Sequence, residues 1–258
     1  MEPVIQIKNL TKSYGAPHNA KPVLKNISID IAPGQVIGYI GPNGAGKSTT
    51  VKILAGLLSD FSGDVFVKGI DVRKNPVEVK SLIGYVPELA ELYDALTPDE
   101  FLSLMGALYN LPEEMIAERA SKMLTAFGLS GQQRMDTFSK GMKQKVLIIS
   151  GLLHNPEIII LDEPLSGLDA NSIIIVKELI VKLAKSGKTI FYCSHMMDVV
   201  EKISDRIILI DKGEVVADGT IDDLRQLQNR ESLEDIFSAL TATESMHEAS
   251  VNLLNAFD

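Results

Sequence analysis

The sequence lacks an excess of basic residues, a second cysteine and any apolar run of membrane-spanning length. A net charge of -9 argues against a protein whose main role is to neutralise a nucleic-acid backbone. The single cysteine, Cys193, excludes an internal disulfide and fits a reducing compartment. Apolar runs such as VLIISGLL at 146–153 fall short of the ~20 residues that cross a bilayer. Any membrane function therefore needs another chain to span the membrane.

The amino terminus also lacks a secretory signal, because MEPVIQIKNL carries an acid at position 2 and polar residues interrupt its apolar runs. We therefore expect a cytoplasmic protein. The sequence shows no internal repeat and no low-complexity tract. With 258 residues, 45% of them hydrophobic and 23% charged, it predicts one compact unit with a subdomain.

Strands dominate the first part of the chain. Alternating and apolar patterns predict strands at 4–10, 23–31 and 35–41, a hairpin at 63–72 and a short strand that ends at Pro87. A helical pattern lies between Gly46 and Ala55.

Helices dominate between about 95 and 155. TPDEFLSLMGALYNL offers Thr97 as a cap and Pro98 at the first helical position, and PEEMIAERASKMLTAFGL has an apolar face and a glycine near its end. We expect an inserted helical lobe over about residues 90–155.

The rest of the core alternates strands and helices. EIIILDEP, after Pro156, has the composition of a strand that is buried on both faces of a parallel sheet. A helix at about 170–186, the strand TIFYCS, another helix and the strand RIILID follow. This alternation predicts an α/β core, with Cys193 as a buried, unreactive thiol.

The final segment, residues 231–258, is expected to form a helical extension of the domain that spans residues 1–230. Ser232 and Asp235 have the spacing of a capping box. One apolar face would carry Leu233, Ile236, Phe237 and Leu240. The helix is either docked on the domain or a dimer contact.

GPNGAGKS, residues 41–48, fits the pattern G-x-x-x-x-G-K-[ST] between a strand and a helix. Its glycines let successive amides point at one anion, Lys47 reaches terminal phosphates and Ser48 offers a hydroxyl to Mg²⁺. The alternative is a glycine-rich turn with a chance lysine, which the flanking elements disfavour. The predicted phosphate-binding residues are Gly41, Asn43, Gly44, Ala45, Gly46, Lys47, Ser48 and Thr49.

IIILDE brings two acids to the carboxyl end of a strand. Asp162 would hold Mg²⁺ or its waters, and Glu163 would polarise the attacking water. The alternative, two acids that merely end a strand at the surface, is disfavoured by the phosphate loop. Together the two motifs predict a P-loop NTPase, a class that includes kinases, GTPases, helicases and motors.

Further motifs narrow this class: FSKGM at 138–142 opens the helix before the strand of Asp162, and SGLDA at 166–170 and SH at 194–195 follow. With its motifs in this order, the chain resembles an ATP-binding-cassette ATPase, the nucleotide-binding subunit of an ABC transporter, over about residues 4–220. The resemblance implies a P-loop NTPase (RecA-like) core, an N-terminal antiparallel β subdomain and an inserted α-helical subdomain. The implied cofactors are ATP and Mg²⁺.

The resemblance also implies residue roles. Tyr14 stacks on adenine, Glu88 takes the position of the usual Q-loop glutamine near the metal, and His195 is the switch histidine on the γ-phosphate. Asp169 is the D-loop acid, and Glu163 is the catalytic base. Alternatives from the residues themselves are a packing role for Tyr14, a helix cap at Asp169 and a solvated His195 after a cap at Ser194.

In the family, the signature contacts the nucleotide of the partner subunit, so Ser139 and the amide of Gly141 would clasp the γ-phosphate of ATP that the other chain holds. The usual Leu-Ser-Gly-Gly-Gln is altered here at Phe138, Lys140 and Met142. Lys140 either adds charge near the phosphates or reaches solvent.

The resemblance implies an ATP-hydrolysing subunit that powers a separate transmembrane permease from the inner face of the cell membrane. GYVPE and SKGMKQK resemble the exporter branch, and the working dimer would be homomeric or heteromeric. One alternative is a soluble ABC-type ATPase acting on nucleic acid or ribosomes; such proteins commonly carry two cassettes or a coiled-coil arm, and we expect no nucleic-acid partner. Another is an ATP-binding regulator without hydrolysis, which Glu163 and His195 disfavour.

Overall fold

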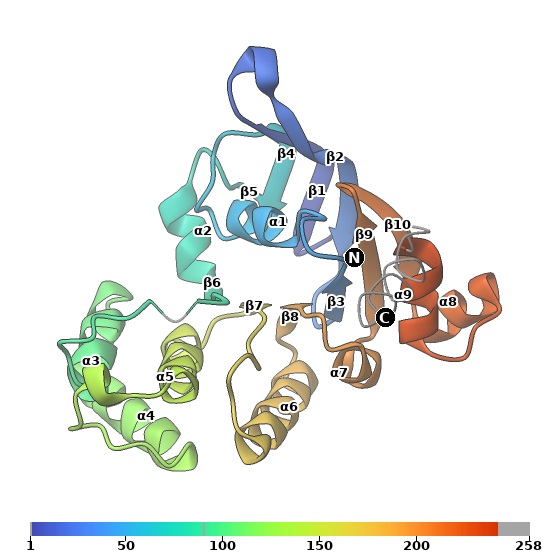
Figure 1. Cartoon of the computed structure of the whole chain (residues 1–258). Helices are drawn as coiled ribbons and strands as arrows, with labels where there is room; N and C mark the ends of the chain where they lie inside the picture. The colour runs from blue at the N-terminus through green and yellow to red at the C-terminus, as the bar shows by residue number, and fades with distance from the viewer. Residues whose placement is uncertain (1, 90, 242–258) are drawn as a thin grey trace, which may run out of the picture.

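Two β-sheets form the centre of the computed structural model, which describes residues 2–89 and 91–241 (Figure 1). Residues 242–258 of the predicted C-terminal extension lie outside the described residues. The first sheet is antiparallel and has the order β2 (Lys21–Ile31), β1 (Ile5–Tyr14), β4 (Ser62–Val67), β5 (Ile70–Asp71). It forms the predicted β subdomain, and the β1–β2 hairpin projects from the top of Figure 1.

The second sheet has the order β10 (Glu214–Gly219), β9 (Arg206–Asp211), β3 (Val36–Ile40), β8 (Thr189–Cys193), β7 (Ile158–Asp162), β6 (Ile83–Val86). All its neighbours pair in parallel except β10, which pairs antiparallel with β9. β3, β7 and β8 are buried along their whole length, as their apolar sequences predict. Cys193 is buried, as predicted, and burial raises the pKa of its thiol.

The parallel strands place the motifs at one edge, because their carboxyl ends point the same way. β3 leads into the phosphate loop and α1 (Lys47–Leu54), and β7 leads into Glu163. β8 leads into His195, and β6 leads into Glu88. In open α/β sheets, this is the edge at which ligands bind.

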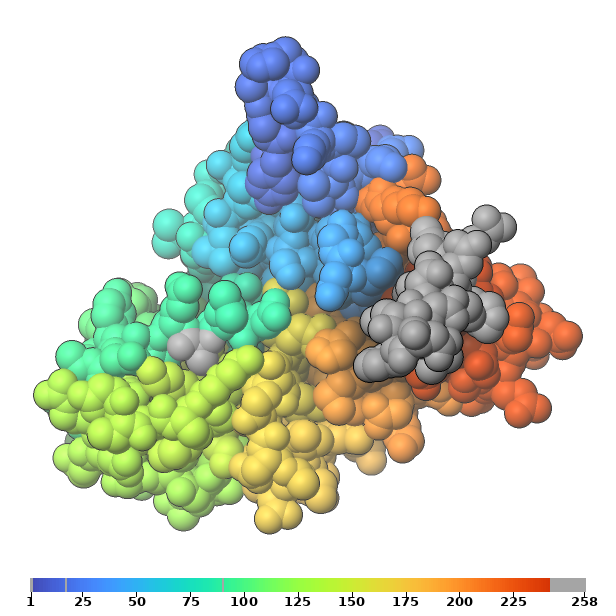
Figure 2. All heavy atoms as spheres, viewed as in Figure 1, coloured from blue at the N-terminus to red at the C-terminus, as the bar shows by residue number. Residues whose placement is uncertain are grey.

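A helical lobe holds α3 (Pro98–Leu108), α4 (Glu113–Ala126) and α5 (Lys140–Leu152), and the short helix Met135–Thr137 precedes α5. Figures 1 and 2 show this lobe in green at the lower left, opposite the β1–β2 hairpin. The predicted cap is confirmed: the Glu100 amide donates to Thr97 Oγ1 (3.3 Å) and the Thr97 amide donates to Glu100 Oε2 (2.8 Å).

The remaining helices are α2 (Pro76–Leu82), α6 (Ala170–Lys185), α7 (Met197–Ile203), α8 (Ile221–Gln228) and α9 (Leu233–Thr241). In α9, Leu233 and Ile236 are fully buried, and Phe237 and Leu240 pack against the core. The Leu233 amide donates to Glu201 Oε2 at 3.0 Å. The docked alternative is therefore confirmed for this helix, because its own chain covers its apolar face.

Candidate functional site

A cavity of about 650 Å³ opens at the carboxyl edge of the parallel sheet. Most of the predicted site residues, drawn from the two sheets and their loops, meet there. Its lining consists of Tyr14, Val23, Asn43, Gly44, Gly46, Lys47, Ser48, Thr49, Glu88, Asp162, Glu163 and His195. Val23 was not predicted, because nothing in the sequence of a hairpin strand shows which end lies over a distant loop.

The phosphate loop has a conformation that requires glycine. Gly46 has φ of 110° and is the N-cap of α1, with no side chain capping the helix. A Cβ at this position would lie 2.5 Å from Leu24 Cδ2 on β2. Because no side chain caps α1, its first backbone amides remain available as donors. The amino end of this helix is therefore suited to bind an anion.

The ammonium of Lys47 is held inside this loop. Nζ donates to the carbonyl oxygens of Gly41 (2.6 Å) and Pro42 (3.2 Å). Gly41 and Ala45 do not line the cavity: Ala45 is buried, and a Cβ at Gly41 would lie 2.3 Å from the carbonyl oxygen of Ile210. These two residues shape the loop from behind.

Asp162 ends β7 as a nearly buried carboxyl group. Burial raises its pKa to about 6; Glu88 and Glu163 add to the rise, whereas Ser48 and Lys47 oppose it. Among residues 2–89 and 91–241, no group of three or more His, Cys, Asp or Glu side chains converges on a metal site.

Glu163 has φ of 48°, an uncommon value for a residue other than glycine. Its amide donates to the Cys193 carbonyl oxygen (2.9 Å), and its Oε2 accepts from Ser194 Oγ (3.1 Å). His195 Nδ1 lies 2.9 Å from the same Oε2, and the His195 side chain is 71% exposed. Both partners of the carboxylate therefore come from the end of β8.

Ser194 does not cap α7, contrary to the expectation from its position. Its hydroxyl accepts from the Met196 amide (3.1 Å), and α7 begins only at Met197. Ser194 is fully buried, and its hydroxyl donates a hydrogen bond to Glu163 Oε2. Sequence reasoning missed this contact, since it joins residues 31 positions apart.

Tyr14 ends β1, and Glu88 follows β6. The Tyr14 side chain is 44% exposed, and its hydroxyl lies 3.5 Å from Thr49 Oγ1. Glu88 is exposed and lines the cavity. Both are open to a bound ligand.

Ser139, Gly141 and Asp169 do not line the cavity. They belong to a second cluster, the signature surface, which we define as residues 139–141 and 166–169. Ser139 is the N-cap of α5 and accepts from the Met142 amide (3.2 Å); a Cβ at Gly141 would lie 2.3 Å from the Gly167 carbonyl oxygen. Asp169 caps α6, as one alternative predicted, by accepting from the Ser172 amide (2.9 Å).

Lysines tie α5 to two loops, one before α3 and one before α6. Lys140 Nζ donates to Ser166 Oγ (3.1 Å), and Lys145 Nζ pairs with Asp169 Oδ2 (2.9 Å). Lys143 Nζ pairs with Asp94 Oδ1 (2.6 Å), in the loop that also contains Glu88. Lys140 is exposed, as the alternative of reaching solvent predicts, although its ammonium also donates to Ser166; a role of its charge near the phosphates stays a prediction.

Comparison with known proteins gives a consistent result. Residues 24–166 match the family model described as ABC transporter. The linearmycin resistance ATP-binding protein LnrL of Bacillus subtilis (strain 168) is 39% identical over 86% of this chain and 70% of its own length. The solved structure of an ATP-binding subunit of an ABC transporter superposes with a TM-score of 0.86, at 32% identity over 93% of this chain and 100% of that one.

A second solved structure is informative about the reaction. It is a dimeric post-hydrolysis state of the ATP-binding cassette MJ0796 bound to ADP and Pi, with a TM-score of 0.78 and 28% identity over 84% of this chain and 98% of that one. The fold prediction is confirmed by these neighbours, and nothing among them supports the nucleic-acid alternative. The chain belongs to the ABC transporter family, as an ATP-binding subunit with ATPase activity.

Proposed function

We propose that two such subunits, identical or related, close on two ATP molecules and drive a separate membrane permease. The observation that supports this most directly is the division of the predicted γ-phosphate contacts. The phosphate loop and His195 line the cavity, whereas Ser139 and Gly141 lie on the signature surface outside it. One chain thus offers two complementary halves of a phosphate site, which a head-to-tail pair would join.

Within the cavity, each predicted residue has a role that its geometry favours. The amides of the phosphate loop and α1 would hold the phosphates, and Lys47 would leave the loop carbonyls for the terminal phosphates. The half-exposed ring of Tyr14 would stack on adenine. On the partner, Ser139, Gly141 and Asp169 would complete the enclosure.

The residues present fit Mg²⁺, which prefers hard oxygen ligands and is usually held by one or two carboxylates together with substrate phosphates. Asp162 and Ser48 would hold it, with Glu88 nearby. Burial, together with the negative charge of Glu88 and Glu163, raises the pKa of Asp162, and a bound cation would compensate that charge. Bound Mg²⁺ neutralises charge on the phosphates during transfer.

In hydrolysis, Glu163 would accept a proton from the attacking water as general base. The hydrogen bond from Ser194 already orients its Oε2, so the carboxylate loses little conformational freedom in the reaction. His195 would exchange its contact with Glu163 for the γ-phosphate, as its high exposure allows. Departure of the products would reopen the pair.

A permease would meet the exposed apolar residues around the helical lobe. Leu104 and Leu108 are exposed on α3, and a cavity of about 200 Å³ between α3 and the end of α1 is lined by Leu57, Tyr85 and Tyr109 among others. No helix within 2–89 and 91–241 has the length and hydropathy of a bilayer span. We therefore place the spanning segments on the partner, and the subunit on the inner face of the membrane.

The exporter assignment rests on the family branch. LnrL is named for linearmycin resistance, and the sequence GYVPE with SKGMKQK resembles the same exporter branch. In this proposal residues 1–230 form the ATPase domain, about 90–155 its helical subdomain, and residues 231–258 an extension whose first helix is docked.

The experiment is light scattering of the full chain with ATP. Glu163→Gln should trap an ATP-bound dimer, and Ser139→Ala or Lys47→Ala in the same background should return it to monomer. Co-purification in mild detergent should recover a permease. A chain that stays monomeric with ATP, even beside that permease, refutes the proposal.

A further inference from the structure

Lys12 carries an almost buried ammonium group outside the cavity lining. It lies on β1 and is 4% exposed, and Nζ pairs with Asp60 Oδ2 at 2.7 Å. Lysine is rarely buried to this degree unless it is paired. Asp60 is 91% exposed, so the carboxylate that compensates the charge of the buried ammonium lies at the surface.

The same ammonium lies against the aromatic ring that faces the nucleotide cavity. Lys12 Nζ is 4.7 Å from the centroid of the Tyr14 ring, which is within the range of a cation–π contact. The Tyr14 hydroxyl lies 3.5 Å from Thr49 Oγ1. The ring is thus held on one face by a cation and at its edge by the loop, and it still lines the cavity.

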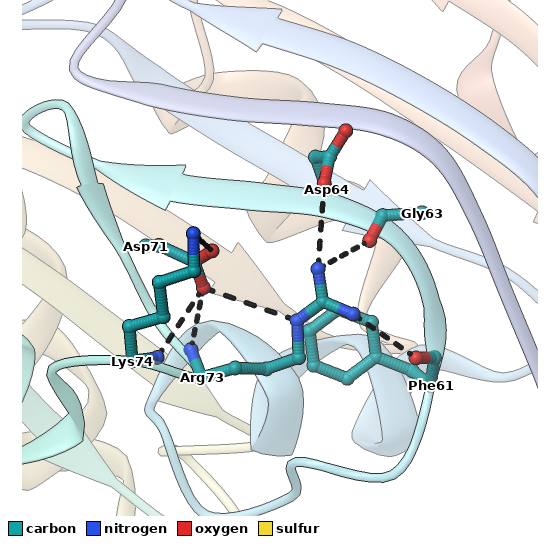
Figure 3. A network of polar contacts seen from close by, with 6 residues as sticks. All are labelled: Phe61, Gly63, Asp64, Asp71, Arg73 and Lys74. Carbon is teal, nitrogen blue, oxygen red and sulfur yellow. Dashed lines mark hydrogen bonds and ion pairs between the residues drawn. The ribbon is translucent and has the colours of Figure 1, made fainter.

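The segment that follows Asp60 is anchored by a separate network (Figure 3). Arg73 donates to the carbonyl oxygens of Phe61 (3.4 Å) and Gly63 (2.9 Å), and its guanidinium carbon lies 4.7 Å from the Phe61 ring centroid. Asp71 accepts from the Arg73 amide at 2.9 Å. The backbone beside Asp60 is therefore fixed from the β4–β5 side.

We propose that Lys12, held by Asp60, is a positioning residue for the nucleotide base: it sets the Tyr14 ring from behind and leaves the opposite face for adenine. This inference rests on the proposed role of Tyr14. A ring that is ordered before binding loses less conformational freedom when the base arrives. A cation on the far face also draws electron density from the ring that adenine meets.

The test compares ATP with inorganic tripolyphosphate, which offers phosphates without a base, by calorimetry in Mg²⁺-free buffer so that no turnover occurs. Lys12→Met should weaken ATP binding roughly 3- to 10-fold, the range expected for losing such a contact, and leave tripolyphosphate binding unchanged. Lys12→Arg should restore most of the affinity for ATP. Lys8→Met is the matched control, because Lys8 is an exposed lysine on the same strand.

Each result decides the matter. Equal losses for ATP and tripolyphosphate, or no loss for ATP, overturn the positioning role. If Lys12→Met does not fold by circular dichroism, Asp60→Asn at the exposed partner replaces it, and a base-dependent loss is again expected. If the unaltered chain binds ATP no better than tripolyphosphate, the adenine role of Tyr14 itself fails, and that outcome is separate from an effect of Lys12.

Discussion

Replacing Glu163 by glutamine removes the proposed base while keeping its shape. The carboxylate Oε2 accepts from Ser194 Oγ at 3.1 Å and lies 2.9 Å from His195 Nδ1. A glutamine carbonyl oxygen can occupy this acceptor position, so the local hydrogen bonds survive. Both the fold and the phosphate loop should therefore be unchanged.

Glu163→Gln should lower the rate of the chemical step much more than it lowers the affinity for ATP. A positioned general base contributes about 10²- to 10⁴-fold, or roughly 2.7 to 5.4 kcal/mol of activation free energy. The loss should appear entirely in the turnover rate, because Glu163 does not belong to the loop that holds the phosphates. The dissociation constant of ATP should stay within about threefold, less than one kcal/mol.

Single-turnover release of phosphate measures this effect, with ATP affinity determined on the same samples. Glu178→Gln is a suitable control, because Glu178 is exposed on α6 and pairs with Lys182 one turn later. It should hydrolyse ATP at the normal rate. Glu163→Gln turnover within tenfold of the unaltered chain would refute the assignment of Glu163 as the base.

Four further predictions test other parts of the site. Lys47→Ala removes a charged donor, so nucleotide titration should show ATP affinity about 10- to 100-fold weaker. Because burial raises the pKa of Asp162 to about 6 and its carboxylate is the form that binds a cation, kcat/KM should fall below that pH. Glu88→Gln removes a carboxylate that helps to raise this pKa, so a pH–rate profile should show the acid limb moved to lower pH. Gly46→Ala places a Cβ at φ of 110° and 2.5 Å from Leu24 Cδ2, so urea denaturation should show a loss of about 1–3 kcal/mol.

Much of the fold was predictable because its signals are local. The capping box at Thr97, the caps at Ser139 and Asp169, and the apolar run of β7 are each contained within a few residues. Among the α-helices and strands of the described residues, α2, β10 and α8 were missed. α2 is a helix of seven residues with one buried side chain, so it shows little helical period. α8 begins with the capping box of Thr220 and Asp223, a local signal that could have predicted it.

β10 illustrates a different limit. Its residues alternate between exposed and half-buried, so its sequence EVVADG shows no strongly apolar face. It forms a strand because it pairs antiparallel with β9, for example at Val215 and Ile210. Edge pairing of this kind depends on tertiary structure and cannot be seen in the segment itself.

The candidate site likewise combines residues that local motifs predict with residues that only the folded chain brings together. The phosphate loop and the two acids at the end of β7 are contiguous strings, and sequence alone predicted their meeting at one sheet edge. Tyr14, Glu88 and His195 could be named only through resemblance to a family, because single residues carry no motif. Contacts such as Ser194 with Glu163 or Lys12 with Asp60 join positions 31 and 48 residues apart, and only the folded chain reveals them.

The lysine ties of α5 make the joint between helical lobe and core sensitive to ionic strength. Asp94 and Asp169 are both more than half exposed, so dissolved ions compete directly for these pairs. The internal contacts of Lys47 in the phosphate loop should respond less to ionic strength, because both of its partners are backbone carbonyls. Added salt should therefore weaken the pairs of α5 with Asp94 and Asp169 before it disturbs the phosphate loop.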